Sequence, residues 1–397
     1  METIDQQKVE RSLALTPSWI ELSRAALENN LSYLREQAGD EVELCSVIKA
    51  NAYGHGIAHF LPLAESCGIR RFALFSTDEA ECAMQARRSS ETDLLIMGAI
   101  PDDALEWVIS NDLSFFVFET DRLEAVLKTV RRIGRTARIH LEIETGMHRT
   151  GIEPDQFEEV SNRIREAGDL IRLEGISTHF AGAESVANHL RIQKQRKRFT
   201  DAVAWFNRAL GPIPLIHAAS SAALFSYPDS TWTMVRLGIA QYGYWPSPEI
   251  QMLARQQEMK LSTRPLERLL NWKSRIMSVK EVKEGEFVGY GTLHMTGRTE
   301  RIATVPVGYS QGFGRNLSNA GYVLVRGERA RVVGAVNMNM LTIDVTEIDG
   351  VQRGDEVVLI GRQGEDEISL ASFGEVQNNL NYEVLARLPE RLPRRIV

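Results

Sequence analysis

The sequence predicts an α/β protein in which an N-terminal TIM-type (β/α)8 barrel precedes a mostly β C-terminal domain. Between residue 42 and about residue 240, eight short apolar segments, many of them β-branched, alternate with longer amphipathic segments. Eight such β/α repeats within about 200 residues suit a closed barrel better than an open parallel sheet. After about residue 260, closely spaced strand patterns separated by glycine-containing turns predict the β domain.

The eight predicted barrel strands are short runs of apolar or β-branched residues. In chain order they span residues 42–49, 71–76, 93–98, 113–118, 137–144, 173–180, 214–220 and 234–238. Helices are expected between them, for example at residues 121–132 and 154–167. Acidic residues come early and basic residues late in these two segments, as the helix dipole favours.

The C-terminal part contains five clear strand patterns. They span residues 301–308, 321–325, 330–336, 341–345 and 356–360. The stretch 244–269, which contains three prolines, is expected to link the two domains because proline interrupts regular structure. We therefore expect an N-terminal extension at residues 1–16, the barrel at 17–258 and the β domain at 259–397.

Composition narrows the classes of partner. The 397 residues are 43% hydrophobic and 25% charged, and a formal net charge of −7 predicts no general attraction to nucleic acid or to an anionic membrane. The three cysteines form no CxxC pair that would hold zinc, and we expect no metal. Residues 1–16 lack the apolar core of a signal peptide, and no apolar run is long enough to span a bilayer. We expect a cytoplasmic protein with a small-molecule partner.

Polar residues follow the ends of the predicted barrel strands, where barrel active sites are found. Lys49 ends the first strand, Glu142 and Glu144 end the fifth, His179 ends the sixth and Arg236 lies in the eighth. A charged lysine is costly to bury at the end of an apolar strand. Lys49 therefore either reaches water or is used as a neutral amine.

Lys49 lies in the string VIKANAYGHG at residues 47–56, which closely resembles the pyridoxal-phosphate lysine motif of alanine racemases. Further blocks that resemble this family follow in the family's order within residues 17–397. They are residues 140–151, 178–181, 217–222, 236–239, 289–291, 306–309 and 381–383. The resemblance implies a barrel followed by a β domain, and a racemase that interconverts L- and D-alanine to supply D-alanine for peptidoglycan.

The resemblance also implies a two-base mechanism with pyridoxal 5'-phosphate as the cofactor. Lys49 would bind the cofactor through its amine and serve as one base. Tyr290 would be the second base, acting on the opposite face of the planar adduct. In the family this tyrosine comes from the partner subunit, so the resemblance implies a homodimer in which Tyr290 and Met338 act across the interface.

Several other side chains resemble the family's cofactor and substrate residues. Arg236 would face the ring nitrogen of the cofactor and, because a guanidinium stays protonated, keep that nitrogen from gaining a proton, which would make side transamination rare. His217 would orient Arg236, although a core histidine without this role is an alternative. The remaining implied residues are Tyr53, His179, Ser221, Gly238, Ile239 and Tyr382 for the cofactor, Arg149 and Met338 for the substrate, and Tyr309 and Arg315 at the entrance.

Glu142 departs from the family pattern. It stands where most members have a lysine that becomes carbamylated and steadies the substrate-binding arginine. A carbamylated lysine carries a negative charge, which a glutamate could supply without carbon dioxide. We hypothesise that Glu142 pairs with Arg149, directly or through water, and a solvated glutamate is the alternative.

Three further departures bear on the substrate. In residues 334–340, GAVNMNM, Ala335 replaces an arginine and Asn339 an aspartate, and Gln311 also replaces an aspartate. A broader-specificity racemase acting on serine or other amino acids is therefore an alternative, because one pocket group changes discrimination by only about 10- to 200-fold. We also consider an amino-acid decarboxylase of the same architecture and a non-catalytic cofactor-binding module. Tyr290 argues against the decarboxylase, and the long β domain argues against the non-catalytic module.

Overall fold

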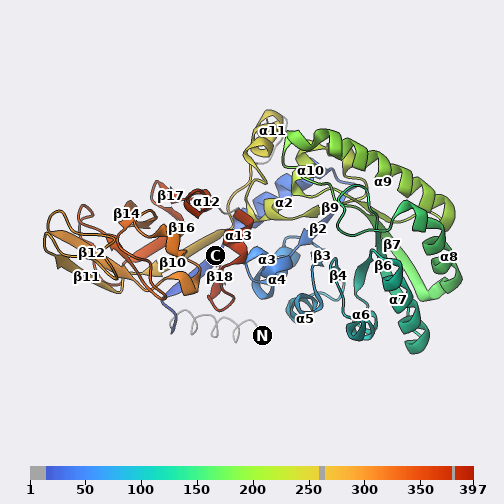
Figure 1. Cartoon of the computed structure of the whole chain (residues 1–397), viewed down its shortest axis with the longest axis horizontal. Coiled ribbons are helices and arrows are strands. Elements are labelled where there is room, and N and C mark those ends of the chain that lie inside the picture. Colours follow the sequence, from blue (N-terminus) through green and yellow to red (C-terminus); the bar gives the residue numbers. More distant parts are fainter. Residues whose placement is uncertain (1–14, 259–263, 378–380) are drawn as a thin grey trace. The chain divides into compact units, whose positions relative to one another are not determined.

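The computed structural model describes residues 15–258, 264–377 and 381–397, which form two compact units (Figure 1). Among these residues, the barrel unit comprises 25–52, 60–258 and 264–267, and the β unit comprises 15–24, 53–59, 268–377 and 381–397. Residues 1–14 of the predicted N-terminal extension lie outside the described residues.

The barrel unit is built on eight parallel strands. They are β2 (Glu43–Val47), β3 (Arg71–Leu74), β4 (Asp93–Ile96), β5 (Ser114–Val117), β6 (Ala137–Glu142), β7 (Ile171–Ser177), β8 (Leu215–His217) and β9 (Met234–Leu237). Strands β2 to β8 pair in chain order, and β9 pairs with β2. A parallel bridge between Ser220 and Arg236 connects the segments at β8 and β9. All eight predicted strands are present, and the predicted barrel is confirmed.

Helices lie along the outside of the barrel strands (Figure 1). They are α2 (Arg24–Ala38), α4 (Ile57–Ser66), α5 (Thr77–Ala86), α6 (Leu105–Ser110), α7 (Thr120–Ile133), α8 (Phe157–Ala167), α9 (His189–Leu210), α10 (Ser221–Ser226) and α11 (Pro248–Glu258). Helix α7 shows why such segments are helical: it buries an apolar stripe, carries Arg131 and Arg132 in its last turn, and ends at Gly134, whose φ is 67°. Within the described ranges, no helix combines the length and apolar character needed to cross a membrane.

The β unit contains a mostly antiparallel sheet. Its strands are β1 (Ser18–Leu22), β10 (Leu270–Arg275), β11 (Ser278–Val282), β12 (Glu300–Val305), β13 (Tyr322–Val325), β14 (Glu328–Val332), β15 (Leu341–Asp344), β16 (Glu356–Gln363), β17 (Asp366–Ile368) and β18 (Arg394–Ile396). The five strand patterns predicted for this part correspond to β12 to β16. Helices α12 (Leu370–Gln377) and α13 (Asn381–Ala386) complete the unit.

Strand β1 shows that the two units are not contiguous in sequence. It pairs antiparallel with β10 and parallel with β18, so residues 18–22 form part of the β-unit sheet, whereas the expected boundaries placed them in the barrel. The pairing partner of Ser18 is Ser274, and the local pattern of a short buried strand does not reveal a partner so distant in sequence.

Candidate active site

Lys49 lies two residues after the last residue of β2, at the C-terminal end of the barrel strands. The next four residues, from Ala50 to Tyr53, all have φ between 50° and 54°, a left-handed turn that costs about 1–2 kcal/mol per non-glycine residue. The Lys49 side chain remains accessible to solvent. Surrounding protein and the cations of Arg149 and Arg236 lower the pKa of its amine, with Glu79 opposing them. The site therefore favours the neutral amine that nucleophilic and base chemistry requires.

The Arg236 side chain is buried within the barrel, and its hydrogen-bond partners among the described residues are all neutral acceptors. Its Nη1 donates to His217 Nδ1 at 2.5 Å, to the His217 carbonyl at 3.0 Å and to Ser177 Oγ at 3.2 Å. Its Nη2 donates to the Thr178 carbonyl at 2.8 Å. Burial lowers the pKa of Arg236 to about 10, so the guanidinium is still a cation at neutral pH. The predicted contact between His217 and Arg236 is therefore present in the structure.

His179 follows β7 and is half-buried beside the same cations. Burial, followed by Arg236, Arg149 and Lys49, lowers its pKa to about 3. His179 is therefore neutral at physiological pH, and we assign it no role as a cationic acid.

Ser221 and the backbone after β9 form a cluster of neutral hydrogen-bonding groups. Ser221 Oγ accepts the N–H of Gly238 at 2.8 Å and that of Ala240 at 3.4 Å, and Ile239 lies between these two donors. In the β unit, the rings of Tyr53 and Tyr382 lie 6.0 Å apart, and burial together with Tyr382 raises the pKa of Tyr53. Hydroxyl and backbone N–H donors of this kind suit an anionic group such as a phosphate.

The loop that carries Arg149 is held from both sides. The Glu144 carboxylate accepts the backbone N–H groups of Gly146, Met147 and His148, the last two at 2.8 and 2.7 Å. From helix α9, Arg191 donates to the Gly146 carbonyl at 2.8 Å and Arg198 donates to the Thr145 carbonyl at 3.0 Å. Backbone N–H groups and backbone carbonyls of residues 144–148 are therefore both hydrogen-bonded, which restrains the loop. The exposed Arg149 side chain extends from the end of this loop.

Gln195 of α9 connects this loop with the His179 segment, a role that the sequence did not suggest. Its Nε2 donates to the His179 carbonyl at 2.9 Å and to Thr145 Oγ1 at 3.2 Å, while its Oε1 accepts the Ala181 N–H at 2.8 Å. Gln195 is 1% exposed, so no water can readily replace it. A buried amide with all its partners on two separate loops fixes the distance between those loops.

Gln195→Ala is expected to lower the free energy of unfolding by about 1–3 kcal/mol, because it leaves buried polar groups without partners. Denaturant titration measures this change. The control is Lys197→Ala on the exposed side of the same helix, which removes only an ion pair with Asp201 and should cost at most about 0.5 kcal/mol. Equal losses in the two variants would contradict the bridging role of Gln195.

Glu142 is buried, but its nearest partner is not the one hypothesised. Its Oε2 accepts the Thr150 hydroxyl at 2.9 Å, and no ion pair within 4.0 Å joins it to Arg149 in the described part of the chain. Burial raises the pKa of Glu142, while Arg236 and Arg149 act in the opposite direction. Glu142 and Arg149 therefore form no direct ion pair in the described part of the chain, and Glu142 is buried rather than solvated.

The remaining predicted residues lie in the β unit. Tyr290 is 77% exposed in the loop between β11 and β12 and lines a hollow of about 350 Å³ together with Phe287, Asn337 and Met340. Tyr309, Arg315 and Met338 lie in the loops on either side of β13 and β14, and the backbone N–H of Tyr309 donates to the Asn337 carbonyl at 3.0 Å.

The departures at Asn339 and Gln311 are connected to each other. Asn339 Nδ2 donates to Ser310 Oγ at 2.8 Å, and Ser310 Oγ donates to Gln311 Oε1 at 2.8 Å. The two amides that replace aspartates therefore form one line of neutral hydrogen bonds. An aspartate at position 339 would replace the donor that faces Ser310 Oγ by an acceptor, whereas the side chain at position 311 already acts as an acceptor.

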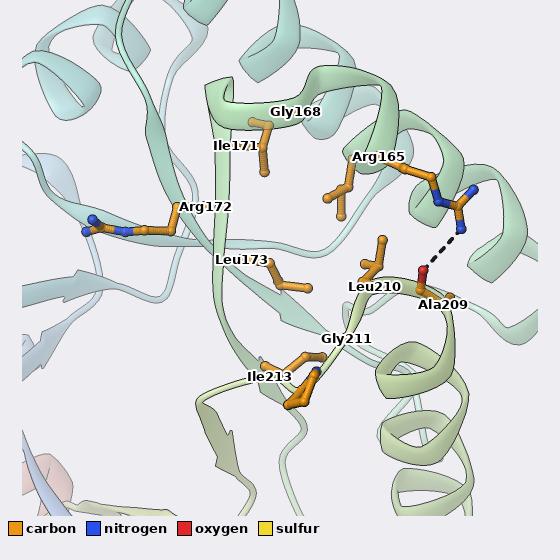
Figure 2. Close-up of a pocket in the computed structure, with 11 residues that line it drawn as sticks. Arg165, Gly168, Ile171, Arg172, Leu173, Ala209, Leu210, Gly211 and Ile213 are labelled. Carbon is orange, nitrogen blue, oxygen red and sulfur yellow. Dashed lines mark hydrogen bonds between the residues drawn. The ribbon is translucent and has the colours of Figure 1, made fainter.

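A hollow of about 400 Å³ lies elsewhere on the barrel unit (Figure 2). It is formed by Ile171 and Leu173 of β7 with Leu210 and Gly211 at the end of α9, and Arg165 Nη2 bonds to the Ala209 carbonyl at 3.1 Å beside it. It contains none of the predicted site residues and lies toward the N-terminal end of β7, whereas Lys49 and His179 follow strand ends. Among the residues described, no three His, Cys, Asp or Glu side chains gather as a metal site would require.

Family models match both parts of the chain. The model described as alanine racemase, N-terminal domain, matches residues 22–246, and the model described as alanine racemase, C-terminal domain, matches residues 269–396. Curated alanine racemases from Leptospira interrogans and Halothermothrix orenii are 34% and 33% identical over 385 and 378 residues. The matches cover 96% and 95% of this chain, respectively, and 96% of each relative.

Solved structures agree with the sequence relatives. Alanine racemase from Clostridium difficile 630 has a TM-score of 0.86 and 31% identity, covering 96% of both chains. The Bacillus anthracis alanine racemase with bound L-Ala-P has a TM-score of 0.84 and 30% identity, covering 96% of this chain and 95% of that chain. Together with a lysine that follows β2 and a buried arginine in β9, these matches identify the fold and the family. The chain belongs to the alanine racemase family.

Proposed function

We propose that this protein interconverts L- and D-alanine with pyridoxal phosphate as its cofactor. The observation that carries the proposal is Lys49, a lysine in the family's motif whose pKa is lowered by burial and by Arg149 and Arg236. A racemase needs a base that is neutral near physiological pH and can reach one face of the substrate. Lys49 has both the position after β2 and the electrostatic surroundings for that task.

The residues of the barrel unit fit this cofactor. Lys49 would bind it covalently, Ser221 with Gly238 and Ile239 would hold its phosphate, and Arg236 would face its ring nitrogen. When bound, the cofactor withdraws electrons from the substrate's α-carbon, so that the α-proton becomes acidic. Arg236 stays protonated at neutral pH, so it can only donate hydrogen bonds to the ring nitrogen. A carboxylate at this place would instead accept a hydrogen bond from a protonated ring nitrogen. Tyr53, His179 and Tyr382 are proposed as further cofactor contacts.

The proton transfer itself falls to two residues. Lys49 takes or returns the α-proton on one face, and Tyr290 does so on the other, since inversion requires a proton to leave one face and arrive on the opposite one. Arg149 and the backbone of Met338 would bind the substrate carboxylate, with Tyr309 and Arg315 at the entrance. His217 holds Arg236 in place through the 2.5 Å hydrogen bond.

The surroundings of Tyr290 support a homodimer. Apolar side chains gather in the same part of the β unit and are more than two-fifths exposed: Phe287, Leu293, Met295, Met338 and Met340. An exposed apolar group of this kind is typical of a protein interface. We propose that it contacts a second copy of the chain and that Tyr290 and Met338 thereby enter the partner's site.

Glu142→Gln is expected to raise KM for alanine by about tenfold or more, because it removes a buried negative charge that acts on Arg149 and Arg236. Steady-state kinetics measures this effect. Thr150→Val is the matched control: it removes the 2.9 Å hydrogen bond but keeps the charge, and should change KM less. Unchanged kinetics of Glu142→Gln, or stimulation of the unmodified protein by bicarbonate, would show that Glu142 does not replace a carbamylated lysine.

Alanine is the proposed substrate, and a broader range of amino acids is the second candidate. The reason is that Asn339, Ser310 and Gln311 form a line of neutral hydrogen bonds. This line lies in the loops that carry Met338 and Tyr309. Chiral chromatography after incubation with L-alanine, L-serine, L-lysine and L-arginine tests both. Formation of D-alanine alone supports the narrow assignment, D-serine with D-alanine supports the broader one, and carbon dioxide release would support a decarboxylase. The D-alanine would be made in the cytoplasm for peptidoglycan.

A further inference from the structure

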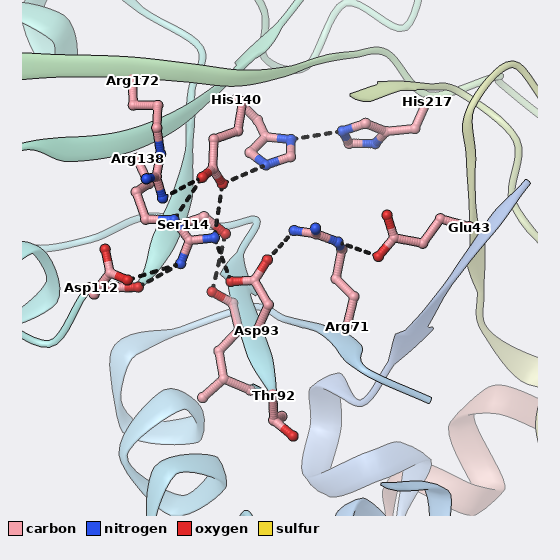
Figure 3. Close-up of polar contacts among 12 residues, drawn as sticks. Glu43, Arg71, Thr92, Asp93, Asp112, Ser114, Arg138, His140, Arg172 and His217 are labelled. Carbon is pink, nitrogen blue, oxygen red and sulfur yellow. Dashed lines mark hydrogen bonds and ion pairs between the residues drawn. The ribbon is translucent and has the colours of Figure 1, made fainter. Parts of the chain in front are cut away.

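Hydrogen bonds connect Arg236 to His217 and His217 to His140 in the barrel interior, and His140 lies near Glu174 at a strand bulge; Figure 3 shows the pair of histidines. Arg236 Nη1 lies 2.5 Å from His217 Nδ1, and His217 Nε2 lies 2.9 Å from His140 Nδ1. The other ring nitrogen of His140, Nε2, faces Glu174 Oε2 at 3.9 Å, which is too far for a hydrogen bond, and it makes none with the described residues. We call these four residues the histidine line.

The protons of the histidine line can be assigned from its chemistry. A guanidinium only donates, so His217 Nδ1 must accept, and a neutral His217 therefore carries its proton on Nε2. That proton is donated to His140 Nδ1, which leaves the proton of a neutral His140 on Nε2, facing Glu174. Both rings are fully buried beside cations, which keeps their pKa values well below the ordinary value and the rings neutral. Every hydrogen bond thus donates away from Arg236.

Glu174 is the fixed end of the line. Arg138 binds it through Nε at 2.8 Å and Nη2 at 3.0 Å, and Arg172 binds it through Nη2 at 2.7 Å. The pairing of β6 with β7 shifts between Ile139 and His140, so that His140 pairs with Gly175 and Glu174 is the extra residue of β7. This bulge brings the Glu174 carboxylate to the same barrel layer as the His140 ring.

Gly175 makes room for the His140 ring. A Cβ atom at Gly175 would overlap His140 Nδ1, the atom that accepts from His217. Phe116 packs beside both imidazoles, with ring centroids 6.2 Å from His140 and 5.9 Å from His217. Gly175 and Phe116 therefore pack closely against the His140 ring, and Phe116 also packs against His217.

We propose that His140 is a positioning residue that acts through His217 on Arg236. By accepting from His217 Nε2, it keeps the lone pair of His217 Nδ1 facing the guanidinium, and so holds Arg236 in place. If His217 carried its proton on Nδ1 instead, two donors would meet at 2.5 Å and Arg236 would be displaced. The inference rests on the proposed function for its catalytic consequence, but its proton assignment stands on the geometry alone.

Long-range ¹H–¹⁵N correlation spectra of the unmodified full-length protein test the assignment with or without cofactor. The expected result at neutral pH is two neutral imidazoles, both protonated on Nε2. A proton on Nδ1 of either ring, or a doubly protonated ring, would overturn the proposal even if no variant folds. If the unmodified, cofactor-loaded protein shows no racemase activity, the proposed function is overturned. The assignment of the histidine protons is not affected by that result.

Two variants at one position separate positioning from packing. His140→Asn keeps an acceptor facing His217, whereas His140→Leu removes it. We expect His140→Leu to alter the His217 tautomer and to lower kcat by about tenfold or more, with little change in KM. A tenfold loss corresponds to leaving one buried donor, the His217 Nε2–H, without an acceptor. His140→Asn should restore most of both properties. Gly175→Ala, which displaces the ring, should resemble His140→Leu, and Phe116→Leu should leave the tautomers unchanged. Equal behaviour of the leucine and asparagine variants would overturn the proposal.

Discussion

Lys49→Ala is expected to lower kcat for alanine racemisation by about 10³-fold or more, the largest effect of any single substitution in this chain. The variant loses both the covalent attachment of the cofactor and the base on one face of the substrate. Burial, Arg149 and Arg236 all lower the pKa of Lys49, which shifts its amine toward the neutral form. Initial rates of D-alanine formation from L-alanine, and of the reverse reaction, measure the loss in both directions.

Lys49→Arg is the matched control. Arginine keeps the positive charge and much of the length, but its guanidinium stays protonated at working pH and cannot act as the neutral amine. It should therefore be as inactive as the alanine variant. Borohydride reduction of the cofactor-loaded protein, followed by peptide mass analysis, should place the cofactor mass on the peptide containing Lys49 and on neither variant. Substantial activity in Lys49→Arg would show that Lys49 serves only as a charge.

Tyr290→Phe is expected to lower racemisation by about 10²- to 10⁴-fold, the usual contribution of one general acid or base. The ring and its exposed setting are retained, so the change removes only the hydroxyl. Lys49 should still exchange the α-proton of one enantiomer with solvent. Exchange in deuterated water without formation of the other enantiomer is therefore the expected signature, and full racemisation by this variant would exclude Tyr290 as the second base.

Hybrid dimers test whether Tyr290 acts across the subunit interface. When Lys49→Ala chains are mixed with Tyr290→Phe chains, each hybrid would contain one site with both residues intact, provided that Tyr290 comes from the partner. Activity should then appear on mixing two inactive proteins. If Tyr290 served the site of its own chain, every site would lack one residue and mixing would restore nothing.

The barrel was predictable because its signals are local. Each strand is a short apolar run, and the polar residues that follow these runs include Lys49 and His179, whose positions after β2 and β7 the structure confirms. The motif around Lys49 also pointed to Arg236 and His217, which meet at 2.5 Å. Periodicity and motif order therefore identify both the fold and the part of the barrel that carries the site.

Other features depend on contacts between distant segments and left no local signal. Strand β1 pairs with β10 across more than half the chain, and Gln195 joins two loops from the buried side of an otherwise basic helix. His140 and Glu174 come together because of a register shift that a pattern of alternating residues does not reveal. Glu142 was recognised as a departure, but its Thr150 partner emerged only from the folded loop.

Proton NMR of the cofactor-loaded protein with L-alanine in deuterated water, followed by chiral analysis of the recovered amino acid, tests the central claim most directly. Two-base racemisation predicts loss of the α-proton signal together with the appearance of D-alanine. Recovery of L-alanine with its α-proton intact would contradict alanine racemisation by this protein, and exchange with complete retention of configuration would contradict the second base.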